Sequence, residues 1–206
     1  MAEVIEIDPH APAAELIARA VRIIQAKGVI IYPTETLYGI GANPFYPEAM
    51  QRLYAIKGRA EAKPIPFLIK DQEMLATLVE EVPAVGRKLM KRYWPGALTL
   101  IFRAKKELPT ALRGKDGFIG VRISTHPVAK AIVQAMDAPL TSTSANLAGE
   151  KDILDGKELA QVFGNQVDLI IDSGKAAGKG STVVDVTVEP PRVVRQGMIR
   201  VPHSLI

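Results

Sequence analysis

The amino-acid sequence predicts an α/β (α+β) domain in which helices flank a mixed β-sheet. Two observations lead to this fold class. Apolar runs of strand length alternate with helical patterns through the first two thirds of the chain, and β-prone runs between Gly- and Pro-rich turns fill the last third. With 206 residues, of which 48% are hydrophobic and 23% charged, the chain fits one large domain better than two.

The first half of the chain contains two helical patterns, each followed by a strand-like run. Residues 13–27 repeat apolar side chains at helical spacing, and Gly28 is placed to end that helix before a buried strand at Val29–Tyr32. Pro47 opens a second helix. A strand at Phe67–Ile69 follows, and Asp71 is suited to cap the helix after it.

The second half is predicted to supply most of the strands. Apolar runs indicate strands at Leu98–Phe102 and Ile119–Ile123, and helices are expected from Pro127 and over Lys157–Phe163. Three more strands are expected between turns, at Val167–Ile171, Thr182–Val186 and Arg192–Val194. The segment Gly174–Gly180 is expected to be the most flexible and able to close over a ligand.

Composition excludes several kinds of site. The chain has no cysteine, so disulfides, zinc thiolates and thiol nucleophiles are ruled out. His10, His126 and His203 share no local motif, so we expect no protein-built metal site. A secretory signal and an apolar stretch of roughly 20 residues are both missing, so we expect a cytoplasmic protein without membrane association. The formal net charge of +4 suits a nucleotide and is compatible with RNA.

The common nucleotide-site and hydrolase motifs fail at particular residues. Gly39-Ile40-Gly41 follows a strand, but the third glycine of a dinucleotide fingerprint would fall on Pro44. Gly178-Lys179 resembles the end of a P-loop, yet Gly180 stands where Ser or Thr is required. No Gly-x-Ser-x-Gly elbow accompanies the histidines. An ATP site in this chain must therefore use another scaffold.

Four polar segments lie beside apolar runs or helix ends, where α/β proteins collect ligands. In Tyr32-Pro33-Thr34-Glu35-Thr36-Leu37-Tyr38-Gly39, Thr36 offers a hydroxyl to a pocket or belongs to a plain turn. Lys57-Gly58-Arg59, followed by Lys63, ends the helix from Pro47. These cations either complement the helix dipole or, because Gly58 halts the helix between them, turn together toward a polyphosphate.

The other two segments lie in the second half. Ser142-Thr143-Ser144-Ala145-Asn146 carries more hydroxyl and amide groups than a plain turn needs, although helix capping by Ser144 or Asn146 would also explain them. Ser181–Thr187, with Arg195-Gln196-Gly197 further on, forms part of a pocket or a β-hairpin with an exposed arginine. Arg122 differs, because an arginine inside an apolar strand must face an anion or solvent.

In this order and at these separations, the four segments resemble the YrdC/YciO family over nearly the whole chain. The family's Lys-x-Arg and Ser-x-Asn pair is matched by Lys57-Gly58-Arg59 and Ser144-Ala145-Asn146. Tyr93-Trp94-Pro95-Gly96-Ala97-Leu98-Thr99 is similar to its Trp-Pro-Gly-x-Leu-Thr stretch. The resemblance implies a single YrdC-like domain over residues 1–206, of YciO-like length, with a twisted mixed β-sheet flanked by helices around a concave basic cavity.

The resemblance also implies an activity and a site. Synthases of this family condense L-threonine, bicarbonate and ATP into threonylcarbamoyl-AMP and pyrophosphate, which downstream threonylcarbamoyl-transferase proteins use to modify a tRNA adenosine. Mg²⁺ would arrive with the triphosphate, held by phosphate oxygens and water, with no protein metal ligand. Implied ATP contacts are Lys57, Arg59, Lys63, Asn146 and Arg195, implied threonine contacts are Thr36, Arg122, Ser144 and Ser181, and implied catalytic residues are Lys57, Arg59, Ser144 and Asn146.

Two departures from the family pattern bear on the substrate. Many synthases have a histidine where this chain has Leu68, and some have an ATP-binding serine where it has Asp152. One alternative is a non-catalytic YciO-type protein that binds tRNA or double-stranded RNA through its basic concave surface. The other is a carbamoyl-transfer relative acting on a different substrate, because hydroxyl and guanidinium groups bind many small amino acids.

Overall fold

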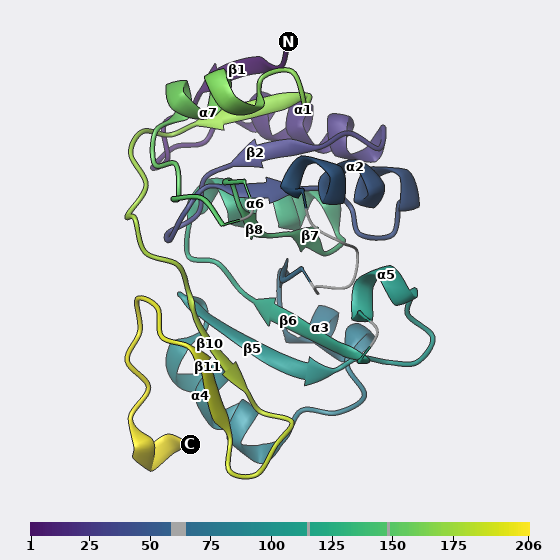
Figure 1. Cartoon of the computed structure of the whole chain (residues 1–206), viewed down its shortest axis with the longest axis vertical. Helices are drawn as coiled ribbons and strands as arrows, with labels where there is room; N and C mark the ends of the chain where they lie inside the picture. The colour runs from purple at the N-terminus through teal and green to yellow at the C-terminus, as the bar shows by residue number, and fades with distance from the viewer. Residues whose placement is uncertain (59–64, 115, 148) are drawn as a thin grey trace.

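The computed structural model describes residues 1–58, 65–114, 116–147 and 149–206. The mixed α/β fold predicted from the sequence is confirmed, but the described strands form two mixed sheets, one above the other in Figure 1, and not the single sheet that was expected. We refer to them as the upper sheet and the lower sheet. The N-terminus lies beside the upper sheet and the C-terminus beside the lower one.

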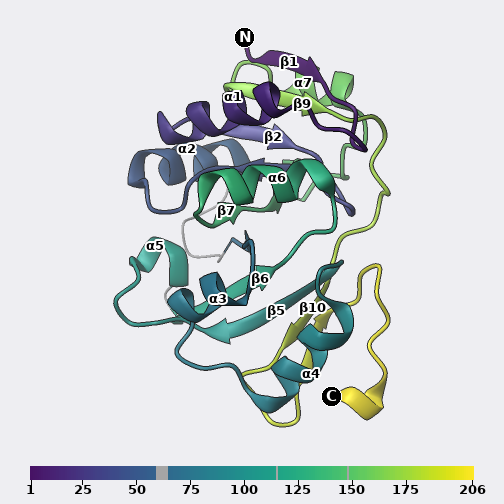
Figure 2. The same ribbon diagram turned by 180° about the vertical axis from the view of Figure 1, so that it is seen from behind.

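The upper sheet has the strand order β1-β9-β2-β3-β8. Its strands are β1 (Glu3–Glu6), β9 (Leu169–Asp172), β2 (Ile30–Tyr32), β3 (Gly39–Gly41) and β8 (Thr143–Ser144). β1, β9 and β2 are parallel, whereas β3 is antiparallel to both of its neighbours. Helices α1 (Ala14–Gln25) and α6 (Pro127–Met136) cover one face, and α2 (Pro47–Lys57) and α7 (Gly156–Phe163) cover the other (Figures 1 and 2).

Side chains of the upper strands point alternately to the two faces of the sheet and so contribute to both helix-covered cores. Ile30 and Leu169 pack with α1 and α6, whereas Ile31 and Ile170 pack with α2 and α7. Successive side chains of a strand point to opposite faces, so a strand buried on both faces is a continuous apolar run. That is the pattern from which the strand at Val29–Tyr32 was predicted.

The lower sheet has the strand order β11-β10-β5-β6-β4-β7. Its strands are β11 (Arg192–Arg195), β10 (Thr182–Asp185), β5 (Leu98–Arg103), β6 (Phe118–Arg122), β4 (Phe67–Leu68) and β7 (Leu140–Thr141). Helices α3 (Gln72–Leu78) and α4 (Ala84–Tyr93) pack on one face, where they bury Leu98, Leu100 and Val121. The short helix α5 (Thr110–Arg113) precedes β6, and a 3₁₀ turn at His203–Leu205 ends the chain.

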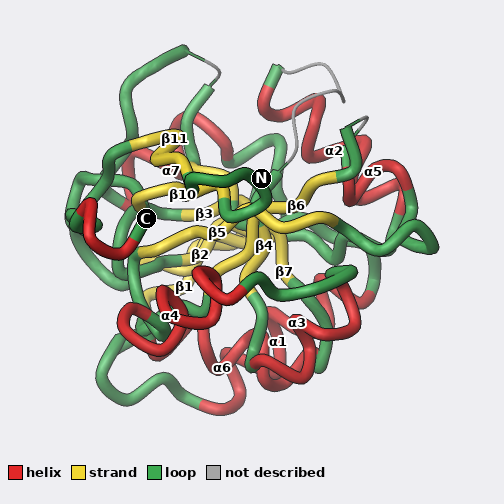
Figure 3. The backbone as a smooth tube through the Cα atoms, turned by 90° about the horizontal axis from the view of Figure 1, so that it is seen from below, coloured by secondary structure: helices red, strands yellow, loops and turns green. Residues whose placement is uncertain are grey.

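The two sheets meet where the chain passes from β7 to β8. Ser142 is the single residue between these strands, and its N–H donates to the Pro66 carbonyl at 2.7 Å. The Tyr32 hydroxyl donates to the Thr141 carbonyl at 2.9 Å, which ties an upper strand to a lower one. Viewed from below, the strands run through the middle of the molecule, with α1, α3, α4 and α6 along one side (Figure 3).

Several local predictions can be compared with these elements. The helix over residues 13–27 is confirmed as α1, but the left-handed residue that ends it is Lys27, at φ 66°, rather than Gly28. Asp71 caps α3 as predicted, accepting from the Met74 N–H at 2.8 Å. Strand β3 was not predicted, because glycine is depleted in strands. Its glycines are needed because a Cβ at Gly41 would meet the Tyr32 ring at 2.7 Å.

Helix α4 was also missed. It is short and rich in cations, and its apolar spacing is confined to a few core positions such as Leu89 and Met90.

Among the helices that the structure describes, none combines the length and apolarity needed to cross a bilayer.

Candidate active site

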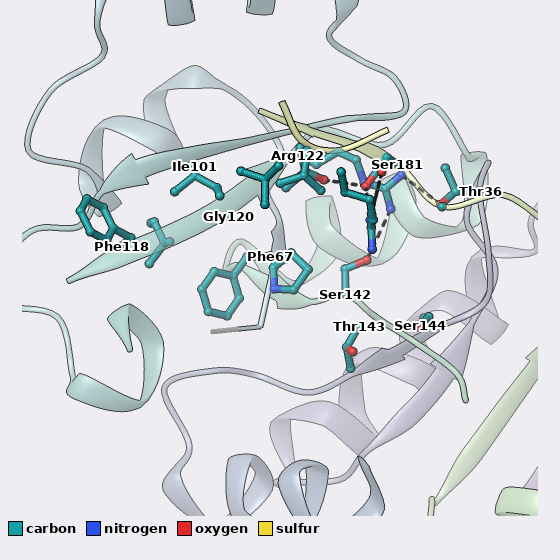
Figure 4. Close-up of a pocket in the computed structure, with 18 of the residues that line it drawn as sticks. Thr36, Phe67, Ile101, Phe118, Gly120, Arg122, Ser142, Thr143, Ser144 and Ser181 are labelled. Carbon is teal, nitrogen blue, oxygen red and sulfur yellow. Dashed lines mark hydrogen bonds between the residues drawn. The ribbon is translucent and has the colours of Figure 1, made fainter. Parts of the chain in front are cut away.

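A cavity of about 520 Å³ opens between the two sheets, within the usual size range for a small-molecule site. Its polar end gathers predicted site residues from four separate segments, namely Thr36, Arg122, Ser144, Ser181 and Arg195. The first four of them are labelled in Figure 4. The rest of the lining is mixed. It includes the apolar residues Phe67, Ile101, Phe118, Ile119 and Val183 and the charged residues Arg113, Asp116, Asp185 and Arg192.

Strand alternation on the lower sheet brings these side chains to one face. Residues Phe118, Gly120 and Arg122 of β6 line the cavity, while Val121 faces the helix-covered core and Ile119 contributes to both. Thr99 of β5 and Val183 of β10 do the same on the neighbouring strands. The helix-free face of the lower sheet is thus the floor of the site.

Arg122 is 5% exposed and makes an ion pair with Glu35, as expected for an arginine inside an apolar strand. Its Nη1 also donates to the Thr36 hydroxyl at 3.3 Å, and its Nη2 lies 3.5 Å from the Ser142 hydroxyl. Thr36 is held by a tight turn in which the Thr34 hydroxyl accepts from the Thr36 and Leu37 N–H groups, each at 3.2 Å. The predicted hydroxyl of Thr36 therefore does reach the pocket.

Arg195 reaches the cavity because of a β-bulge. Val183 pairs with Arg195 and Val184 with Val193, so Val194 is an extra residue on β11. Paired residues share a face of the sheet, and Arg195 therefore joins Val183 on the cavity side. In an unbulged register Arg195 would lie on the opposite face.

Main-chain and side-chain contacts hold Arg195 in place. Its Nε and Nη2 donate to the Ser181 carbonyl at 3.2 and 3.0 Å, and Nη2 also lies 3.2 Å from the Ser181 hydroxyl. The Ser181 hydroxyl is 2.8 Å from that of Thr99, the last residue of the Trp-Pro-Gly stretch. Gly197 permits this packing, since a Cβ there would lie 2.2 Å from the Gly180 carbonyl oxygen.

The electrostatic surroundings of Arg195 are mixed. Burial lowers the pKa of its guanidinium, the negative charge of Asp152 raises that pKa, and the positive charge of Arg122 lowers it. Asp152 thus acts on Arg195 through its charge, without a direct ion pair between them in the described part of the chain.

Lys57 lies next to Ser144 and Asn146, which joins the Lys-x-Arg segment to the Ser-x-Asn segment. Its side chain is fully buried, and its Nζ donates to the Ser144 carbonyl at 2.7 Å and to the Asn146 carbonyl and Oδ1 at 2.5 and 2.7 Å. The Ser144 hydroxyl donates to the same Oδ1 at 2.8 Å, and Asn146 Nδ2 donates to the Glu150 carbonyl at 2.8 Å. Ser144 lines the cavity, whereas Lys57 and Asn146 are not among its lining residues.

The remaining predicted residues are placed as follows. Arg59 and Lys63 lie outside the described residues. The capping alternative for Ser144 and Asn146 is wrong, because Ser144 belongs to β8 and Asp155 caps α7, the next helix of the described chain. Leu68 is 1% exposed and pairs with Arg122 across the lower sheet, and its side chain packs in the core with α1 and α6.

Sequence reasoning did not single out Glu35, Ser142 or Thr99. Glu35 and Ser142 lie inside two of the polar segments described above, but nothing in the local sequence pattern indicates that they contact Arg122. A buried arginine needs an anion beside it, and this rule was the available signal. The rule does not identify which carboxylate pairs with the arginine. The apolar part of the cavity lining was missed because its residues come from four separate strands.

Comparisons with known proteins show which proteins this chain resembles. A family model named for Sua5, YciO and YrdC, with the description telomere recombination, matches residues 22–197. The threonylcarbamoyl-AMP synthase of Pyrococcus abyssi is 33% identical over 179 residues, which cover 86% of this chain and 53% of that protein. The chain thus spans about half the length of this relative.

Two further similarities bear on the site. The Escherichia coli protein YciO, described as uncharacterized, is 36% identical over 200 residues and is covered over 97% of its length, with 96% of this chain. The crystal structure of Pyrococcus abyssi Sua5 complexed with L-threonine superimposes with a TM-score of 0.90 at 31% identity, covering 94% of this chain and 57% of that one.

Proposed function

The chain belongs to the Sua5/YciO/YrdC family, and we propose that it is an L-threonylcarbamoyladenylate synthase. In this proposal it condenses L-threonine, bicarbonate and ATP to threonylcarbamoyl-AMP and pyrophosphate. The observation that carries the proposal is the convergence of Thr36, Arg122, Ser144, Ser181 and Arg195 on one cavity. The similarity to a synthase and to a threonine-bound structure gives the proposal its substrates.

The polar end of the cavity suits an amino acid. Arg122 presents a guanidinium for the carboxylate, and the hydroxyls of Thr36, Ser144 and Ser181 surround the space beside it. Lys57, Arg59, Lys63, Asn146 and Arg195 are the proposed ATP contacts. Of these, Arg195 lines the cavity, and Lys57 contacts the Ser144–Asn146 segment, of which Ser144 lines the cavity.

The proposed reaction needs no nucleophile from the protein. The amine of L-threonine first attacks the carbon of bicarbonate, a C–N bond forms and water leaves, which gives the carbamate N-carboxythreonine. A carbamate oxygen then attacks the α-phosphorus of ATP, a P–O bond forms, and the bond to the leaving pyrophosphate breaks. The protein must hold two anions close together and stabilise the charge that develops on the phosphorus oxygens. In this proposal Mg²⁺ arrives with ATP and is held mainly by phosphate oxygens and water.

The proposed product is an activated carbamoyl group that needs an acceptor. We propose that downstream threonylcarbamoyl-transferase proteins transfer it to a tRNA adenosine in the cytoplasm. These partner proteins are inferred from the family resemblance, and no surface feature of this chain is used to infer them.

The test is incubation of the pure protein with L-threonine, bicarbonate and Mg-ATP, followed by detection of pyrophosphate and threonylcarbamoyl-AMP. Release of pyrophosphate that depends on both threonine and bicarbonate supports the synthase. Release that does not depend on threonine indicates the carbamoyl-transfer relative with another substrate. No release, together with RNA binding that weakens steeply with salt, indicates the RNA-binding alternative and overturns the proposal.

A further inference from the structure

A second cavity of about 310 Å³ lies behind the polar end of the first. Both cavities are lined by Thr34 and Tyr38, but Glu35 lines only the second and Arg122 only the first. The Glu35–Arg122 ion pair is therefore part of the wall between them. Its members are 16% and 6% exposed, so the pair is largely removed from solvent.

We propose that Glu35 is the positioning residue for Arg122, holding its guanidinium so that Nη2 faces the first cavity as the seat for a substrate carboxylate. The inference deepens the proposed function and rests on it for the identity of the substrate. Glu35 does not touch the substrate in this proposal. It acts through Arg122.

Both oxygens of the Glu35 carboxylate are engaged. Oε1 accepts from Arg122 Nη1, and Oε2 accepts from the Ser124 hydroxyl. The Ser124 oxygen is itself fixed, because it accepts the N–H of His126 at 3.1 Å, at the start of α6. Glu35 is thus anchored to the scaffold and not free to follow a ligand.

This anchoring selects one edge of the guanidinium. Glu35 and Thr36 accept from Nη1, which has two hydrogens to give. Nη2 makes only the long contact of 3.5 Å to Ser142 within the described part of the chain. An incoming carboxylate therefore finds Nη2 available and already oriented, so less freedom is lost on binding.

Glu35 also allows two arginines to share the polar end. The positive charges of Arg122 and Arg195 are close enough to act on each other. A carboxylate behind Arg122 offsets part of that repulsion without occupying the cavity. Removing it would let the Arg122 side chain move away from Arg195 and from the carboxylate seat.

The test compares Glu35→Ala with Glu35→Gln, and uses Glu48→Ala as the matched control. Glu48 is also paired with a cation, Lys27, but at the surface and outside both cavities. Binding of L-threonine and of L-threoninamide, which lacks the carboxylate, is measured by calorimetry. The mobility of Arg122 is followed separately by the NMR order parameter of its Nε–H group.

We expect Glu35→Ala to weaken L-threonine binding roughly tenfold or more, the loss of one well-placed charge-assisted contact. Binding of threoninamide and of ATP should change much less, and the Arg122 order parameter should fall. Glu35→Gln keeps an oxygen for Nη1 and should recover most of the threonine affinity. Glu48→Ala should match the wild type.

Two results distinguish this inference from the proposed function. An unchanged Arg122 order parameter in Glu35→Ala overturns the inference, whatever the protein binds. Equal losses for threonine and threoninamide also overturn it, because they indicate a general structural defect. If the wild type fails to bind threonine while the order parameter still falls in Glu35→Ala, the positioning role stands and the proposed substrate is wrong.

Discussion

Replacing Lys57 by methionine removes the ammonium that joins α2 to the Ser144–Asn146 segment. Three hydrogen bonds of 2.5–2.7 Å are lost with it. Hydrogen bonds to a charged group contribute about 1.5–3 kcal/mol each, and desolvating a buried ammonium takes back several kcal/mol. The Asn146 carbonyl also loses its lysine donor. We therefore expect the free energy of unfolding to fall by about 2–4 kcal/mol, which is a large share of the 5–15 kcal/mol typical of a domain.

Urea unfolding measures this loss as a lower midpoint at unchanged slope. Lys27→Met is the matched control, because Lys27 also donates a 2.6 Å hydrogen bond, to Glu48, with both side chains more than half exposed. An exposed pair contributes about 0–1 kcal/mol, so the control should be nearly neutral. Equal midpoints for the two variants would refute the assignment of Lys57 as a buried link between the two motifs.

The same variant separates two roles for Lys57 in ligand binding. If its ammonium contacts only phosphate, Lys57→Met weakens ATP binding and leaves threonine binding unchanged. If it acts by holding the Ser144–Asn146 segment, both ligands bind less well, because Ser144 lines the cavity at the proposed threonine site. The buried position and three short contacts favour the second outcome.

Three further changes test other parts of the site. Asp152→Ser removes a negative charge that acts on Arg195, and should lower the KM for ATP roughly twofold to fivefold, less at high salt; an unchanged KM would mean that ATP does not approach Arg195. Burial lowers the pKa of His126 below its ordinary 6.5. The free energy of unfolding, followed by urea midpoints, should therefore be highest above that pH and fall below it. His126→Asn keeps an acceptor for the helix cap and should show less of this pH dependence. Gly197→Ala places a Cβ 2.2 Å from the Gly180 oxygen and should cost about 1–3 kcal/mol by the same measurement; a neutral result would show that this turn yields easily.

The fold and much of the site could be predicted because they depend on local patterns. The apolar run of β2 and the helical spacing of α1 are visible in the sequence, and so is the arginine at position 122 of an apolar strand. Arg195 shows the limit. The face of the sheet on which Arg195 lies depends on a one-residue bulge of β11 opposite Val183 and Val184. Strand alternation in the sequence does not reveal this bulge.

Tertiary pairing accounts for the other omissions. The carboxylate that pairs with Arg122 lies 87 positions earlier, and Lys57 lies 87 and 89 positions from the two residues whose main chain it binds. No local rule selects such partners. Similarly, β3 contains two glycines that a strand pattern disfavours, and it forms because the Tyr32 ring needs the space that those glycines leave.

The two cavity arginines that were predicted for anions each have a carboxylate nearby, but the two carboxylates differ in kind. Glu35 is largely buried and bonded through both oxygens, so it remains beside Arg122 when a ligand arrives. Asp152 is exposed and acts on Arg195 through its charge alone, so the charge of a phosphate can outweigh it. In the proposed synthase, Arg122 is therefore the fixed, partly neutralised guanidinium that suits a single carboxylate. Arg195 is the proposed contact for a more highly charged ligand, and binding of that ligand should respond most to replacing Asp152 by serine.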